Sequence, residues 1–370
     1  MHFPSKRRFF VSLALVAALT ASAADAPAQP PKNPKVAPGT VGTSQLAGTD
    51  AKIGTIYSLK GGTYLPSFNF TLLEAAYSVE RVNIGNDSYY PQGDEKLLVL
   101  KYQLQNPQKK DIRIPVYALT RRLFQAVAED NQTYDAVKTD KAGVLDGAYD
   151  PLKPLSHENL LLKPSQKSPI FLSVIRVPAK GVVPKLIVQS GRVGTNEEVL
   201  RYDLRGKVKP LPAPYGDPAD SNGADVRDPV PGEIGKEYVL GRSNFTLDKI
   251  EYVMEPFGKA KLRDGEHLLV GTGTMRYMDA RSGMVFNSSE NFAITLEDTD
   301  GEKMNYRDRF YLPTRDTRVD ATRYNPGDTR KFRFYFVLPK DARGKILTVT
   351  NTKLGDKTGR SVQYDLSQMP

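Results

Sequence analysis

The strongest constraint on the fold is an internal repeat. Residues 69–80 read NFTLLEAAYSVE and residues 244–255 read NFTLDKIEYVME, and six of the twelve positions are identical in register. Other segments recur in the same order: IGTIYSL and IGKEYVL before the repeat, GDEKLLVLKYQL and DGEHLLVGTGTM after it, and YDL near the end of each half. Because so many landmarks recur in one order, we interpret the chain as two copies of one structural unit.

The repeated segments have the patterns of β-strands. LLVLKYQL is rich in apolar residues, and FRFYFVLP places Phe332, Phe334 and Phe336 on one face of a strand. Turn-forming PGD and DTDGE sequences separate such runs. Residues 117–130 have a helical spacing of apolar side chains, from which we expect at most a short helix, because their counterpart has a strand pattern. The chain is predicted to be all-β, with two tandem immunoglobulin-like antiparallel β-sandwiches.

Composition places the boundaries of the two copies. Residues 24–51 are rich in Pro, Ala, Gly and Thr, and they predict a flexible leader because they bury too little apolar surface to offset the entropy of ordering. Residues 207–231 contain KPLPAPYGDPAD and predict a Pro-rich linker. The first sandwich is therefore expected at residues 52–206 and the second at residues 232–370.

The N-terminus has the pattern of an export signal. Three basic residues at 6–8 precede an apolar run at 9–20, and Ala-Ser-Ala at 21–23 matches a cleavage site. The apolar run is too short to span a bilayer. We expect a signal peptide over residues 1–23, cleaved near Ala23, and a secreted or periplasmic, envelope-associated protein. The sequence RRFF leaves both general secretion and the twin-arginine route open.

Residue usage excludes several classes of function. The 370 residues include no cysteine, which rules out disulfides, thiolate metal sites and a cysteine nucleophile. The net charge of +10 favours adsorption to anionic surfaces, but the basic residues are interspersed with Asp and Glu. No basic run reaches the length of a nucleic-acid patch, so we expect no nucleic-acid partner. Beyond the signal peptide no stretch is predicted to span a membrane.

Few residues are suited to catalysis. Only His157 and His267 remain after signal cleavage, no GxSxG motif occurs, and two histidines without cysteine do not predict a zinc site. His267 stands at the repeat position of Lys96, which we expect to be an exposed strand end. Glu95 and Glu266 are a candidate carboxylate pair for hydrolysis of an extracellular polymer. We nevertheless predict that the protein is no enzyme and uses no cofactor.

The acidic turn at residues 297–302 offers oxygen ligands for calcium. Asp298, Asp300 and Glu302 are the candidate ligands, and the two aspartates are a second candidate pair for the hydrolase alternative. Asp-Gly is itself a strong hairpin signal, which already explains these residues. We therefore predict no metal site and keep the three residues as candidates.

Tyrosines are the candidate contacts for a ligand, because the chain has no tryptophan. Tyr89 and Tyr90 in DSYYPQ and Tyr215 in APYGDP have loop-like contexts, where a ring can stack on a sugar or a peptide. The repeated tyrosines are instead expected to pack at the edge of the core; they are the pairs Tyr57/Tyr238, Tyr77/Tyr252 and Tyr202/Tyr364. Phe70 and Leu72, with their counterparts, are expected to be buried as well.

The landmarks together resemble a known pattern. It combines a strand ending near an Asn, an acidic turn followed by Tyr, a PG or PS turn, and a strand closing in VP or LP. The chain resembles the telokin-like, immunoprotective extracellular family of secreted bacterial proteins, a domain of unknown function. The second half matches better, because the first has Pro164-Ser165 at the turn and an insertion at residues 138–158. The resemblance implies an immunoglobulin-like fold and an extracellular location, and it supplies no active site.

We therefore expect a secreted, non-enzymatic binding or interaction protein of the cell envelope. Its expected partner is an envelope protein or a polysaccharide. A carboxylate-based hydrolase of an extracellular polymer and a passive surface spacer are the alternatives.

Overall fold

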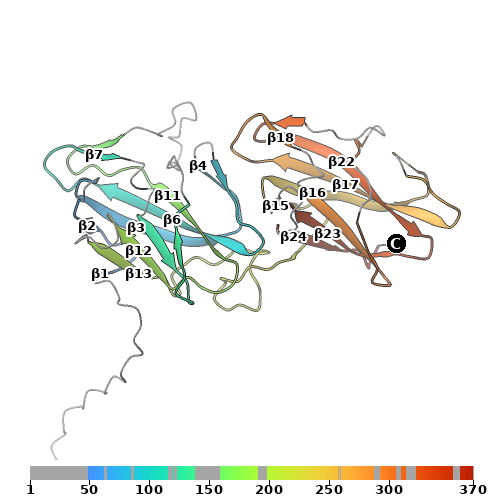
Figure 1. Cartoon of the computed structure of the whole chain (residues 1–370), viewed down its shortest axis with the longest axis horizontal. Coiled ribbons are helices and arrows are strands. Elements are labelled where there is room, and N and C mark those ends of the chain that lie inside the picture. Colours follow the sequence, from blue (N-terminus) through green and yellow to red (C-terminus); the bar gives the residue numbers. More distant parts are fainter. Residues whose placement is uncertain are drawn as a thin grey trace, which may run out of the picture. The chain divides into compact units, whose positions relative to one another are not determined.

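The computed structural model describes residues 49–61, 65–84, 87–115, 119, 123–137, 159–190, 198–256, 258, 260–286, 292–305, 310–313, 322–352 and 359–369. The chain divides into the units Met1–Leu46 and Ala47–Pro370, and every described residue belongs to the second. Its named elements are strands (Figure 1), and no described helix is long and apolar enough to cross a membrane. The predicted signal peptide, the insertion at 138–158 and His157 lie outside the described residues.

The first half pairs a four-stranded sheet with a five-stranded sheet. The four-stranded sheet has the order β11 (Phe171–Pro178), β6 (Glu95–Gln105), β3 (Phe68–Ser78) and β2 (Tyr57–Leu59). The five-stranded sheet has the order β1 (Thr49–Ala51), β13 (Val199–Asp203), β12 (Lys185–Gln189), β8 (Phe124–Val127) and β9 (Thr133–Asp135). Two ribbons accompany them, β7 (Ile112–Pro115) with β10 (Asn159–Leu162) and β4 (Val82–Ile84) with β5 (Asp87–Tyr89). β1 runs parallel to its partner β13, so the last residues of the predicted leader form an edge strand.

The second half has the same strand order. Its four-stranded sheet contains β15 (Glu237–Leu240), β16 (Ser243–Val253), β17 (Glu266–Tyr277) and β22 (Thr329–Pro339). Its five-stranded sheet contains β14 (Val230–Pro231), β24 (Ser361–Asp365), β23 (Gly344–Asn351), β19 (Phe292–Asp298) and β20 (Lys303–Asn305), with β18 (Met284–Phe286) and β21 (Thr322–Tyr324) as a ribbon. A β-bulge interrupts β3 between Leu72 and Glu74, and another interrupts β16 between Leu247 and Lys249. The repeated sequences thus form equivalent strands with the same irregularity.

Alternating apolar residues fill the space between the two sheets of each half. In the first half, the ring of Phe124 in β8 lies 4.9 Å from that of Tyr102 in β6, so the sheets pack face to face. In the second half, Phe245 in β16 lies 5.7 Å from Phe292 in β19. Phe70, Leu72, Tyr77, Phe245 and Leu247 are buried, whereas Tyr252 is half-buried.

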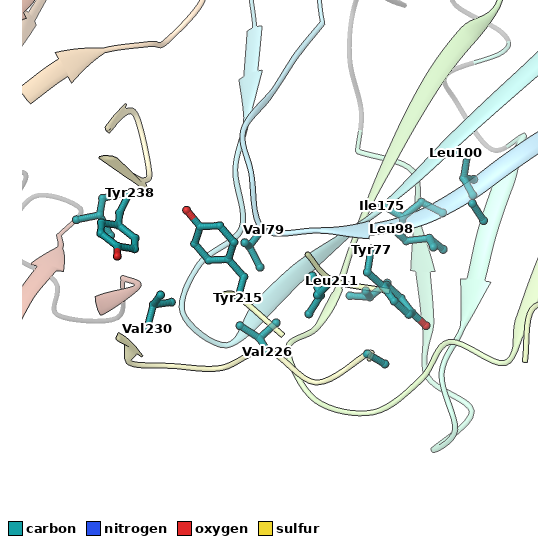
Figure 2. Packing of buried hydrophobic residues seen from close by; sticks show 14 of the residues in the cluster. Tyr77, Val79, Leu98, Leu100, Ile175, Leu211, Tyr215, Val226, Val230 and Tyr238 are labelled. Carbon is teal, nitrogen blue, oxygen red and sulfur yellow. The ribbon is translucent and has the colours of Figure 1, made fainter. Parts of the chain in front are cut away.

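Residues 207–231, the predicted linker, pack against the first half. Leu211, Tyr215 and Val226 are buried in the same hydrophobic cluster as the sandwich cores (Figure 2). The backbone of Lys209 forms a parallel bridge with Ala76 at one edge of β3, donating to the Ala75 carbonyl at 2.9 Å and accepting from the Tyr77 amide at 2.9 Å. The segment therefore has a defined conformation although its composition is that of a linker.

Candidate functional site

The three predicted binding tyrosines lie at contacts between different parts of the fold. Tyr89 is 8% exposed and belongs to a small cluster with residues of β4, β6 and β11. The hydroxyl of Tyr90 accepts a hydrogen bond from Nε of Arg242 at 3.1 Å. Tyr215 is also 8% exposed, and its hydroxyl accepts the Val239 amide at 3.3 Å. The rings of Tyr89 and Tyr215 are packed, so little of either is left for stacking on a ligand.

Arg81 connects the start of the β4–β5 hairpin to the second half. Its Nε and Nη2 donate to the carbonyl oxygen of Gly241 at 3.0 and 2.5 Å, and Nη2 lies 3.4 Å from Oδ1 of Asn244. On the same hairpin, Oγ of Ser88 accepts the Ala280 amide at 2.7 Å. Burial lowers the pKa of Arg81 to about 10, so the guanidinium keeps its charge at neutral pH.

Arg360 connects the second half to the first. It precedes β24, is 3% exposed, and its Nη2 donates to the carbonyls of Gln92, at 3.4 Å, and Glu95. Its Nε and Nη1 have no hydrogen-bond partner among the described residues. Burial lowers the pKa of Arg360 to about 10, opposed by the nearby charge of Asp228. The half-buried Arg81 and the buried Arg360 thus each donate to backbone carbonyls of the other half.

Lys96, at the start of β6, is completely buried. Its Nζ donates to the carbonyls of Gly181, Ala224 and Ala179 at 2.5, 2.6 and 3.4 Å. Burial lowers the pKa of Lys96 to about 8, against the opposing charges of two aspartates in residues 207–231. The expectation of an exposed strand end is therefore wrong, because two loops close over this position. Nothing in the local sequence distinguishes Lys96 from an exposed lysine.

His267 occupies the same position in the second half and is also buried, at 5% exposed. Its ring centroid lies 4.9 Å from that of Tyr252, and the Arg343 guanidinium lies over the same tyrosine at 5.1 Å. Burial, with Arg343 and Lys340 adding repulsion, lowers the pKa of His267 below its usual value.

The candidate carboxylates bond to nearby backbone amides. Oε2 of Glu95 accepts the Gln92 amide at 3.0 Å, and Oε2 of Glu266 accepts the Arg263 amide at 2.8 Å. These two glutamates close equivalent turns in separate sheets, so the fold does not bring them together as a pair.

The acidic turn has a similar local explanation. Oδ1 of Asp298 accepts the amides of Asp300 and Glu302 at 3.0 and 2.8 Å. Gly301 has a φ of 85°, as the turn requires. The described residues include no group of three or more His, Cys, Asp or Glu side chains that is arranged to hold a metal ion.

Two small hollows flank the turn at residues 128–131. One has a volume of about 200 Å³, with Lys185 and Arg205 on its rim, and the other about 180 Å³, with Val182 and Lys180. Glu129 borders both. Lys180 is already paired with Asp217 and Asp225, at 3.3 and 3.4 Å, and none of the predicted binding tyrosines lines either hollow.

Among known proteins, similarity was found to solved structures. No family model and no curated protein matches the chain. An uncharacterised β-sandwich protein from Clostridium difficile 630 is 16% identical, with 41% of this chain and 100% of that protein covered and a TM-score of 0.30. A candidate lipoprotein of Bacillus subtilis strain 168 is 17% identical over 36% of this chain and 38% of its own, with a TM-score of 0.26. The yjhA protein of Bacillus subtilis is 18% identical over 36% and 99%, with a TM-score of 0.25. The fold is all-β, and the resemblance to the telokin-like family stays a prediction.

Proposed function

We propose that the protein is a secreted, non-enzymatic binding protein of the cell envelope. Its two halves present their surface to an envelope protein or a polysaccharide. The net charge of +10 on the full sequence falls by 3 to +7 once the signal peptide is removed, and it still favours an anionic partner. The family resemblance and the export signal of the sequence support the location.

The observation that carries this proposal concerns carboxylate and tyrosine side chains at equivalent positions of the two halves. In both halves these side chains accept hydrogen bonds from nearby backbone amides. Glu95 and Glu266 each bond to a backbone amide three residues earlier. The hydroxyls of Tyr57 and Tyr238 accept the amides of Lys52 and Glu233, both at 2.9 Å. Because the same bond recurs in two copies, the architecture explains these groups without catalysis.

Three measurements on the full chain after export test the proposal. The first is retention on phosphatidylglycerol vesicles and on immobilised anionic and neutral polysaccharides, the second is cross-linking to envelope proteins in cells, and the third is a screen with glycosidase, esterase and peptidase substrates. We expect saturable binding to one class of surface and no turnover. The double variant Glu95→Gln with Glu266→Gln should bind as the wild type does.

Turnover that disappears in that double variant would establish the hydrolase alternative instead. The protein is instead a passive surface spacer if no surface retains it, no envelope protein is cross-linked and no substrate is turned over. That result would refute both the binding and the hydrolase hypotheses.

A further inference from the structure

Three backbone carbonyl groups converge on the ammonium group of Lys96. Those of Ala179 and Gly181 belong to the connection between β11 and β12, and that of Ala224 belongs to the predicted linker. The ring of Tyr77 completes the enclosure, with its centroid 4.5 Å from Nζ. Carbonyl oxygens and the face of an aromatic ring are both groups that attract a cation.

Neighbouring bonds hold two of these oxygens in place without Lys96. The carboxylate of Asp220 accepts the amides of Asn222, Ala224 and Asp225 at 2.9, 2.6 and 2.8 Å, which shapes the turn that carries the Ala224 carbonyl. Oδ1 of Asp225 accepts the Gly181 amide at 2.7 Å and so ties the two segments together. The carbonyl oxygens of Gly181 and Ala224 are therefore positioned by hydrogen bonds that do not involve Lys96.

The second half carries a different side chain at the equivalent position. His267 replaces Lys96 and packs on Tyr252, the counterpart of Tyr77. Its Nε2 atom has no hydrogen-bond partner among the described residues. The first half has an ammonium group at this position, and its three N–H donors serve three carbonyls.

We propose that the carbonyls of Ala179, Gly181 and Ala224, with the Tyr77 ring, form a cation-binding cage that the Lys96 ammonium fills from within the chain, fastening residues 207–231 to the first half. Hydrogen bonds from a charged donor are stronger than neutral ones, so one side chain can hold both segments. Since the pKa of Lys96 is about 8, the group is charged at pH 7. Removing its side chain leaves a cage with the chemistry to take a small cation that carries N–H groups.

Hydrogen exchange of the full chain at pH 7 tests this proposal. In Lys96→Ala, the amides of Leu211 and Val226, which bond to Gly223 and Ala179, should lose protection by about tenfold or more. Methylammonium chloride should restore much of that protection. Tetramethylammonium chloride at the same concentration should not, because it has no N–H donor. The matched control His267→Ala should leave these amides unchanged and gain nothing from methylammonium.

Protection in Lys96→Ala within a factor of about two of the wild type, or equal effects of the two salts, would refute the cage. If Lys96→Ala does not fold, acylation of the wild type with an amine-reactive ester decides. Lys96 should react far more slowly than exposed Lys110 and Lys163, and equal rates would show that no segment closes over it. Neither result depends on which envelope surface the protein binds.

Discussion

At the residue scale, the two halves reach similar packing with different side chains. Leu100 in β6 pairs with Ser173 in β11, whereas the equivalent pair in the second half is Gly271 with Phe334. A Cβ atom at Gly271 would overlap the Phe334 ring. The large side chain has therefore moved from one strand to its neighbour, and the volume between the sheets is filled in both cases.

This exchange predicts the effect of a single methyl group. Gly271→Ala should lower the free energy of unfolding by about 1–3 kcal/mol, because the ring of Phe334 has to shift in a packed core. Combining Gly271→Leu with Phe334→Ser, the pair used by the first half, should be less destabilising than Gly271→Leu alone. Urea unfolding measures both effects, and strictly additive costs would contradict the exchange.

His267 predicts a pH dependence of stability. Its pKa in the folded chain is lowered, so below pH 6.5 the unfolded chain binds more protons and stability falls as the pH drops toward the lowered pKa. Above pH 6.5 the group contributes no such penalty. The free energy of unfolding of the wild type should therefore fall more between pH 7 and pH 5 than that of His267→Gln. His157→Gln is the control, and identical slopes for wild type and His267→Gln would exclude this role.

At the element scale, the bulges in β3 and β16 set which residues face the core. Leu73 is the extra residue of β3, and Asp248 is the extra residue of β16. Leu73 is 36% exposed although it is a leucine. Leu73→Asp should therefore change the free energy of unfolding by less than about 0.5 kcal/mol. Deleting Leu73 should instead prevent folding, since a one-residue shift turns the core face of the strand outward. Circular dichroism and urea unfolding distinguish the two, and a well-folded deletion would refute this role of the bulge.

The strands were predictable from the sequence because their apolar pattern is local. The contacts of Tyr215 and Lys96 were not predictable, because they involve residues far away in the sequence. The alternation from Phe332 to Phe336 predicts β22, and those rings are buried as expected. Tyr215 has a Pro-rich neighbourhood typical of a loop, yet its ring is buried by distant residues. Lys96 bonds to Ala224, which is 128 positions away in sequence. No local pattern records such a contact, so the sequence predicted the elements and missed how the predicted linker packs.

At the scale of the whole molecule, Arg81 and Arg360 bear on how the two halves unfold. Arg81 donates from the first half to the Gly241 carbonyl, and Arg360 donates from the second half to the carbonyls of Gln92 and Glu95. Replacing either arginine leaves partly buried carbonyl groups without their donor, and an unsatisfied buried group typically costs about 1–3 kcal/mol. Because both contacts join the halves, their loss should weaken the coupling between them as well as the total stability.

Calorimetry of the full chain checks that coupling. In the wild type we expect one cooperative transition, because unfolding either half breaks the bonds of both arginines. In the double variant Arg81→Met with Arg360→Met, the transition should broaden or divide into two, with the first midpoint below that of the wild type. The control Arg113→Met with Arg263→Met removes the same charge from two exposed positions and should keep one transition. If the double variant unfolds in a single transition at the wild-type midpoint, the arginines do not couple the halves.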